Sequence, residues 1–183
     1  MKVGIIADTH DNLKAVRYLV EFFNNSGVEV LLHAGDFISP FVIPELASFE
    51  GRVIGVFGNN DGDRETLAEF SEKHDLDLCA GPRRFEIGDR TFLMAHRAED
   101  LPQDIPAEID VVISGHTHRP VNEKRSGYLK INPGEAGGWL TCTIHSLLLD
   151  LDDLKTEIFI VHKEKYQEYF ESLCHKKKLK LHY

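Results

Sequence analysis

The stretch Lys2-Val3-Gly4-Ile5-Ile6-Ala7-Asp8-Thr9-His10 places a short apolar run directly before two side chains that can bind metal ions. Four later runs follow the same plan, and they end at Asp36, at Asn59, at His96 and at the pair His116 and His118. Short runs rich in Val and Ile are typical of buried strands. In open α/β sheets, ligands bind beyond the carboxyl ends of the strands, so we expect these oxygen and imidazole donors to meet at one edge. This pattern indicates a metal-dependent enzyme.

The overall composition is that of one globular domain. The 183 residues suffice for one sizeable core, and 42% hydrophobic and 28% charged residues are ordinary values. The net charge of −9 argues against a general nucleic-acid binder or a membrane-surface protein, although bound cations can reverse the local field. The N-terminal residues resemble a strand and not a leader, so we expect a cytoplasmic protein. The cysteines form no C-x-x-C pair, and we expect inert thiols at Cys79, Cys142 and Cys174.

Helices and strands alternate in the first half of the sequence. Apolar spacing and helix-start residues predict three helices, over Asn12–Asn25, Pro44–Glu50 and Asp63–His74. The turn Gly88-Asp89 predicts a hairpin between Arg84–Ile87 and Thr91–Ala95. Further strands are expected over Tyr128–Ile131, Leu140–Leu149 and Lys155–Val161. This order, with βα units followed by mostly antiparallel strands, indicates a mixed α/β domain with two sheets.

The last residues, 163–183, differ from the rest in charge. Six lysines and three glutamates give them about +3, while the remainder carries −12. The spacing of Tyr166, Phe170 and Leu173 predicts an amphipathic helix that ends in Lys176-Lys177-Lys178. We therefore divide the chain into a domain over residues 1–162 and a basic amphipathic tail over 163–183. The tail is either a surface helix or a contact with a partner or a second copy.

The residue types at the expected sheet edge suit divalent cations. On extended backbone, side chains two residues apart point the same way, which would pair the donors of Asp8-Thr9-His10 and those of His116-Thr117-His118. Asp36 supplies a carboxylate that can bridge two cations. In Gly58-Asn59-Asn60-Asp61, the Asn59 side chain offers a neutral oxygen, although this segment is also typical of a plain turn. The Asp8 segment is equally suited to start a helix.

These motifs together resemble the calcineurin-like metallophosphoesterases, and within them the small prokaryotic phosphodiesterases of the YfcE type. The matching positions are Asp8-x-His10, Gly35-Asp36, Gly58-Asn59-x-Asp61, His96, Gly115-His116-x-His118 and Asn132-Pro133-Gly134. The resemblance implies an α/β fold, a single-domain two-sheet β-sandwich flanked by helices, over residues 1–162. It also implies two cations. Asp8, His10, Asp36 and His118 would hold the first, and Asp36, Asn59, His96 and His116 the second, with Asp36 as the bridge.

The resemblance also implies hydrolysis of phosphodiester bonds by a hydroxide that bridges the two cations. Mixed oxygen and imidazole ligands suit Mn, Fe, Co, Ni or Zn, and we expect Mn²⁺. We expect a small phosphodiester or nucleotide as substrate, no long nucleic acid or membrane as partner, and a homodimer or higher homo-oligomer. Two alternatives stay open, a phosphomonoesterase and a non-catalytic metal-binding scaffold for protein interactions with the same fold.

Two positions depart from the family pattern. Asn60 stands where many members have a histidine that stabilises or protonates the leaving group, and an amide cannot act as a proton donor near neutral pH. Arg97 stands where the family usually has glycine. Its guanidinium could bind a substrate phosphate together with Asn59, or pair with the acidic residues at 99 and 100.

Three other residues and one segment complete the expected site. Asp11 and Asp61 are expected to orient catalytic groups from behind the ligands, and His33 to lie in the core near Asp36. The segment Asn132–Glu135 is either part of the family pattern or a plain turn.

Overall fold

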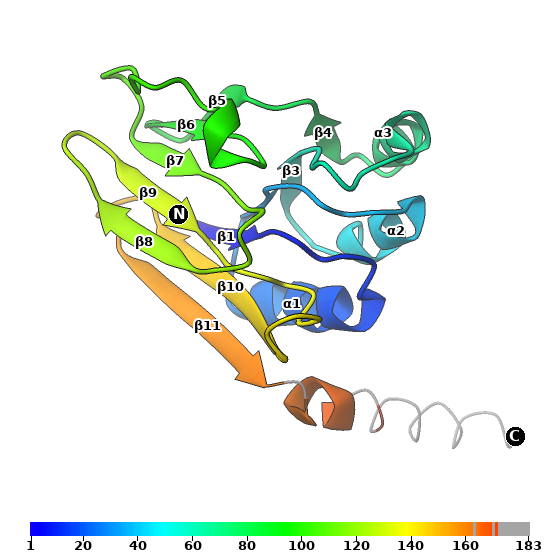
Figure 1. The fold of residues 1–183 in the computed structure, drawn as a ribbon. Coiled ribbons are helices and arrows are strands. Elements are labelled where there is room, and N and C mark those ends of the chain that lie inside the picture. Colours follow the sequence, from blue (N-terminus) through cyan, green and yellow to red (C-terminus); the bar gives the residue numbers. More distant parts are fainter. Residues whose placement is uncertain (163, 170, 172–183) are drawn as a thin grey trace, which may run out of the picture.

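The structure, a computed structural model, describes residues 1–162, 164–169 and 171. Two sheets stack face to face, and helices cover the outer face of the larger one (Figure 1). The larger sheet has the order β11 (Thr156–His162), β10 (Thr143–Asp150), β1 (Lys2–Ile6), β2 (Val30–His33), β3 (Arg52–Val56) and β4 (Asp77–Cys79). The smaller sheet has the order β5 (Arg83–Ile87), β6 (Arg90–Met94), β7 (Val111–Ile113), β9 (Leu129–Asn132) and β8 (Val121–Lys124). The predicted two-sheet sandwich is confirmed.

The strand β1 is buried on both faces because it lies between two apolar layers. Val3 and Ile5 pack in the layer between the sheets, against residues such as Met94 and Ile113. Ile6 packs in the other layer, which contains the apolar face of α1 (Leu13–Asn25). Burial on both faces explains why the run before Asp8 is continuously apolar.

The helices begin where side chains cap them. The Asn12 side chain accepts a hydrogen bond from Ala15 N at the start of α1, and Asp63 caps α3 (Arg64–Lys73) in the same way. The helix predicted over Pro44–Glu50 is wrong in its bounds, since the chain forms a 3₁₀ turn, η1 (Pro40–Val42), and then α2 (Ile43–Leu46). Proline fits the first turn of a helix, so Pro40 and Pro44 place both starts earlier than predicted. A second 3₁₀ turn is η2 (Ala98–Asp100).

The pairing of the later strands is only partly as predicted. The β5–β6, β8–β9 and β10–β11 pairs are antiparallel, but β7 pairs in parallel with both β6 and β9. The expectation of mostly antiparallel strands is therefore wrong around β7, because residues 95–110 return the chain to the starting end of β6. The strands β6 and β7 then end side by side, which brings His96 close to His116.

The strand expected to begin at Leu140 begins at Thr143. The backbone N–H groups of Leu140 and Thr141 donate instead to the buried Glu135 carboxylate, so they are not free for a sheet. The sequence reading also missed β4 and β8. The first has three residues and the second is mostly exposed, so neither shows an apolar alternation.

The start of the tail is helical over residues 164–169. Tyr166 is buried in the layer beneath α1, and its hydroxyl accepts a hydrogen bond from Asn12 Nδ2 (3.2 Å). Phe170, Leu173 and Lys176-Lys177-Lys178 of the predicted amphipathic helix lie outside the described residues. Within the described ranges, no helix is both long and apolar enough to span a bilayer.

Candidate active site

The predicted donors meet beyond the ends of β1, β2, β3, β6 and β7, and most of them lie on sharply turning backbone. Asp8, His10, Asp36, His116 and His118 all have positive φ, from 44° to 68°. Residues other than glycine rarely adopt this conformation, and it gathers at functional sites. The expected extended backbone at the Asp8 and His116 pairs is therefore wrong. The side chains converge because the backbone turns, and not because of strand alternation.

Glycines allow the ligand loops to pack closely. A Cβ at Gly35, where φ is +94°, would lie 2.7 Å from His96 Nδ1. A Cβ at Gly58 would lie 2.1 Å from Asp36 Oδ1. Any side chain at either position would displace a donor, so these glycines are part of the site.

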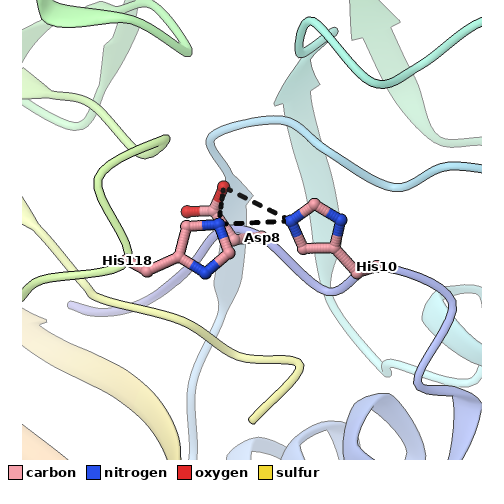
Figure 2. A group of neighbouring side chains, drawn as sticks. All are labelled: Asp8, His10 and His118. Carbon is pink, nitrogen blue, oxygen red and sulfur yellow. Dashed lines mark hydrogen bonds and ion pairs between the residues drawn. The ribbon is translucent and has the colours of Figure 1, made fainter. Parts of the chain in front are cut away.

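Asp8, His10 and His118 form a first group of candidate metal ligands, called the first ligand group below and shown in Figure 2. The Nε2 atoms of His10 and His118 lie 3.3 Å apart. Asp8 Oδ1 lies 3.6 Å from His118 Nε2 and 4.0 Å from His10 Nε2. Three donor atoms from β1 and β7 loops thus face one point, as ligands of a single cation do.

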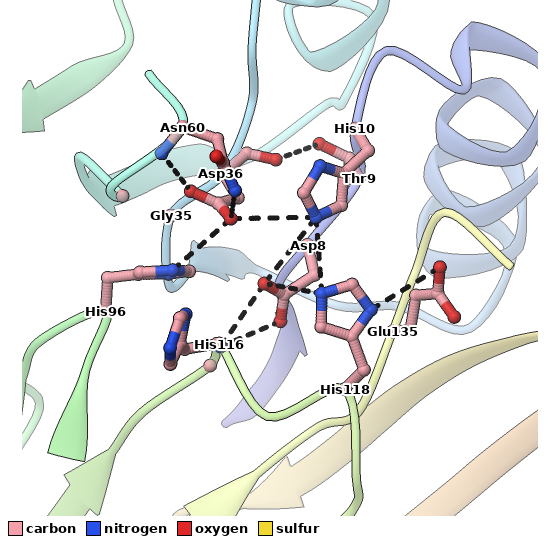
Figure 3. Close-up of polar contacts among 12 residues, drawn as sticks. Asp8, Thr9, His10, Gly35, Asp36, Asn60, His96, His116, His118 and Glu135 are labelled. Carbon is pink, nitrogen blue, oxygen red and sulfur yellow. Dashed lines mark hydrogen bonds and ion pairs between the residues drawn. The ribbon is translucent and has the colours of Figure 1, made fainter. Parts of the chain in front are cut away.

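Asp8, Asp36 and His96 form the second ligand group (Figure 3). Asp36 Oδ2 lies 3.4 Å from His96 Nε2 and 3.6 Å from His10 Nε2, so it faces both groups. Asn59 Oδ1 lies 3.0 Å from His96 Nε2 and extends the second group with a neutral oxygen.

His116 lies beside the second group in a different way. Its ring packs edge to face against His96, with centroids 5.2 Å apart. Its backbone N–H donates to both carboxylate oxygens of Asp8, at 3.2 and 3.0 Å. All seven predicted ligands are therefore at one place, with Asp8 a member of both groups and the His116 ring outside them.

The electrostatics of the site favour a bound cation. Burial raises the pKa of Asp8 to about 7, and the nearby Asp36 carboxylate adds to this rise, while His96 opposes it. Burial would also raise the pKa of Asp36, but hydrogen bonds from His96 and Asn60 outweigh burial and hold this pKa below its usual value. Burial lowers the pKa of His10, which favours the neutral ring that binds metals. Burial would also lower the pKa of His96, but its hydrogen bond with Asp36 and the nearby Asp36 and Asp8 carboxylates raise it. Buried carboxylates beside imidazoles, with no thiolate among the described residues of the two groups, fit a divalent metal ion.

The Asp61 and Asp11 carboxylates accept hydrogen bonds from backbone N–H groups, and neither residue is part of the two ligand groups. Asp61 accepts hydrogen bonds from Gly58 N (2.6 Å), Ile38 N (2.8 Å) and Asp36 N (3.2 Å). It thereby ties the Asn59 turn to the Asp36 turn. Asp11 accepts from the backbone N and the hydroxyl of Ser39, at 3.1 and 2.8 Å.

Asn60 and Arg97 contact ligand residues. The Asn60 amide donates to Asp36 Oδ2 (2.8 Å), and its backbone N–H donates to Asp36 Oδ1 (2.9 Å). Arg97 Nε donates to Asn59 Oδ1 (3.2 Å). Among the described residues, no ion pair joins Arg97 to the acids at 99 and 100, which was the alternative. Its charge reaches His116, whose pKa is lowered first by burial and then by His96 and Arg97.

The sequence reading missed the role of Glu135. This side chain is buried, and one of its oxygens lies 3.5 Å from His118 Nδ1. Burial would raise its pKa, but hydrogen bonds from residues 139–141 lower it more, so the carboxylate stays charged. Metal-binding histidines usually have such a partner behind the ring. The one feature of the sequence that could have indicated this role is the position of Glu135 directly after the family motif Asn132-Pro133-Gly134.

His33 lies in the core behind the ligands, as predicted. Its Nδ1 accepts from Gly35 N (3.1 Å), so Nε2 carries the proton toward Thr9 Oγ1 (3.0 Å). The Thr9 hydroxyl in turn donates to the backbone oxygen of Asp36 (3.2 Å). Complete burial lowers the pKa of His33 to about 3, so this connection between the two loops is neutral.

Comparison with known proteins agrees with this geometry. Residues 1–154 match the family model of the calcineurin-like phosphoesterase superfamily domain. The chain is 40% identical over 148 residues to Phosphodiesterase MJ0936 of Methanocaldococcus jannaschii, covering 77% of this chain and 87% of that protein. It is 28% identical over 150 residues to Phosphodiesterase YfcE of Escherichia coli K12, covering 73% of this chain and 78% of that protein.

Among solved structures, one described as a novel archaeal phosphodiesterase is similar in fold. It aligns with a TM-score of 0.78 at 34% identity, over 88% of this chain and all of that one (100%). The family resemblance and its YfcE-type relatives are thereby confirmed. This chain belongs to the calcineurin-like phosphoesterase superfamily.

Proposed function

We propose that this protein is a dimetal phosphodiesterase that acts on small phosphodiesters. The observation that supports this most directly is the position of Asp36. Its Oδ2 atom lies within 3.6 Å of His10 Nε2 and 3.4 Å of His96 Nε2, so one carboxylate faces both ligand groups. The two relatives named above are both described as phosphodiesterases, which favours diesters over monoesters as substrates.

In this proposal the ligands divide between two cations. Asp8, His10, Asp36 and His118 hold the first, and Asp36, Asn59, His96 and His116 hold the second. When bound, the two cations supply a nucleophilic hydroxide at neutral pH and offset the charge of the phosphoryl oxygens. The oxygen and imidazole donors suit Mn²⁺, with Ni²⁺, Co²⁺, Fe²⁺ or Zn²⁺ as substitutes.

The other site residues bind or orient. Arg97 and Asn59 bind the substrate, since a guanidinium donates in a forked geometry that matches the oxygens of an anionic group. Asn60 steadies Asp36 and donates no proton, so diesters with good leaving groups should react best. Asp11 and Asp61 hold the ligand turns in place. The cytoplasmic location and the homo-oligomeric state stay predictions.

The test uses metal-stripped protein and two chromogenic substrates, bis(p-nitrophenyl) phosphate and p-nitrophenyl phosphate. We expect turnover of the diester that depends on added Mn²⁺ and that His118→Ala abolishes. His74→Ala, at an exposed position, is the matched control. Preference for the monoester would make the protein a phosphomonoesterase. No turnover with Mn²⁺, Ni²⁺, Co²⁺ or Zn²⁺ would favour the non-catalytic scaffold.

A further inference from the structure

A pocket of about 220 Å³ lies next to the second ligand group. Asn59 and His96 of the site form part of its wall, and Phe57, Arg64, Arg97 and Asp100 complete the part that matters here. The pocket is therefore continuous with the metal ligands, and a group bound in it would be part of a substrate held at the cations.

The charge of this pocket is opposite to that of the protein. Its lining includes two arginines and one acid, Asp100, whereas the whole chain carries −9. A concave patch of reversed sign attracts a ligand of the opposite charge. The pocket thus favours an anion, in a protein that otherwise repels anions.

Arg64 is held in place by backbone. Its Nε donates to Asp61 O (3.1 Å) and its Nη2 donates to Gly58 O (2.7 Å), while the guanidinium carbon lies 5.9 Å from the centroid of the Phe57 ring. A guanidinium has five N–H donors, so most of them remain for a ligand. Because the group is already immobilised, binding costs little side-chain entropy.

Arg97 is oriented by the metal site itself. Its Nε donates to Asn59 Oδ1 (3.2 Å), and the same oxygen lies 3.0 Å from His96 Nε2. Among the described residues, no hydrogen bond holds its remaining N–H groups, which can bind an anion in the pocket. Planar guanidinium groups bind phosphate or carboxylate through two parallel hydrogen bonds.

The size of the pocket limits what it can hold. Pockets that bury drug-sized ligands measure roughly 300–1,000 Å³. At about 220 Å³, this one suits a phosphate or carboxylate and its linker better than a nucleobase.

We propose that this pocket binds a second anionic group of the substrate. The preferred substrates are then phosphodiesters that carry a further phosphate or carboxylate on one ester group. This rests on the proposed function, because it places the scissile phosphate at the two ligand groups and the second anion between Arg64 and Arg97.

The experiment compares three p-nitrophenyl phosphodiesters that release the same leaving group. Their other ester group is ethyl, 2-carboxyethyl or 2-phosphonooxyethyl. Charge-assisted hydrogen bonds predict a kcat/KM about 10-fold or more above that of the ethyl ester for at least one anionic ester. The ester with the larger gain identifies carboxylate or phosphate as the bound group.

The variants Arg64→Gln and Arg97→Gln should each reduce this preference toward one. Arg84→Gln, which removes an exposed arginine paired with Glu108, is the control and should keep it. Equal kcat/KM on all three substrates, or a preference that survives both substitutions, would overturn the proposal while leaving the phosphodiesterase in place. No turnover of any of the three with any metal would overturn the proposed function as well.

Discussion

The two ligand groups differ in what lies behind them. In the first, His118 Nδ1 faces the buried Glu135 carboxylate at 3.5 Å. In the second, His96 Nδ1 donates to the backbone oxygen of Ala34 at 2.8 Å, and the adjoining oxygen belongs to the neutral Asn59. The first side is therefore backed by negative charge, whereas the second is not and opens onto two arginines.

This difference predicts different roles for the two sides in binding the metal ions and the substrate. Negative charge behind an imidazole raises its basicity and the affinity of its metal ion. The second side has no such charge behind His96 and so attracts its cation less strongly, but for the same reason it repels an anionic substrate less. We therefore expect the first cation to bind more tightly than the second, and the substrate to approach from the second side.

The largest effect is expected at Asp36, because this residue faces both ligand groups and so belongs to neither side of the comparison alone. Asp36→Asn removes the charge of the carboxylate that faces both groups, so both cations should be lost. We expect kcat/KM on bis(p-nitrophenyl) phosphate to fall by about 1,000-fold or more, beyond the 10- to 100-fold typical of residues behind the ligands. Metal content measured on the same sample should fall with it. Full metal content in an inactive variant would contradict the bridging role.

Glu135→Gln should weaken the first side alone. We expect the affinity for the tighter Mn²⁺ to fall by about 10- to 100-fold, and that for the weaker one to change little. Calorimetric titration of metal-free protein measures both steps. Glu123→Gln, at an exposed acid paired with Arg125, is the matched control. Equal weakening of the two steps would show that Glu135 supports the fold and not His118.

Asn60→His would change the second side from a fixed amide to a titratable group. An imidazole can protonate a departing oxygen, so we expect a gain of about 10-fold or more on a diester with an alkyl leaving group. The gain should be smaller on the p-nitrophenyl ester, which needs no proton. The ratio of the two rates measures this, and an unchanged ratio would argue against a missing general acid. Loss of the Asn60 hydrogen bond to Asp36 is checked through metal content.

Asn59→Asp would make the two sides more alike. A carboxylate next to the second cation should tighten the weaker Mn²⁺ by about 10-fold, by simple charge attraction. The same charge would neutralise Arg97, so KM for an anionic substrate should rise. If KM stays constant while metal affinity increases, Arg97 does not contact the substrate.

The smallest effect concerns the stability of the metal-free protein. Since burial raises the pKa of Asp8 from 3.8 to about 7, the folded chain keeps a proton between these values that the unfolded chain has released. Because the unfolded chain binds fewer protons than the folded chain in this window, the free energy of unfolding falls as the pH rises through it. Metal-free Asp8→Asn should therefore unfold at a higher temperature than the wild type at pH 7.5, by about 2–4 °C for each kcal/mol of this loss that the substitution removes, with little difference near pH 4.

Thermal unfolding in the presence of a chelator measures this shift. Added Mn²⁺ should raise the unfolding temperature of the wild type and not that of the variant. A variant that is less stable than the wild type at pH 7.5 without metal would show that Asp8 stabilises the fold through its hydrogen bonds from His116 N.

Much of the fold follows from local pattern. The apolar runs before Asp8, Asp36 and His96 are strands because each lies inside a buried layer, and burial demands apolar residues on any topology. The strand β8 was missed because exposed residues have no such demand. The Leu140 error has another cause, since the Glu135 carboxylate accepts hydrogen bonds from the backbone N–H groups that a strand would need.

The sequence by itself determined the fold class, the sheet edge and the seven donors, because strand ends and residue types are local properties. Only the tertiary structure decided how those donors group, that Glu135 stands behind His118, and that Arg64 and Arg97 share a pocket. These depend on left-handed turns and on contacts between segments far apart in the chain. Residue type alone specifies neither, since the backbone conformation at Asp8 or His118 is imposed by the packing around it.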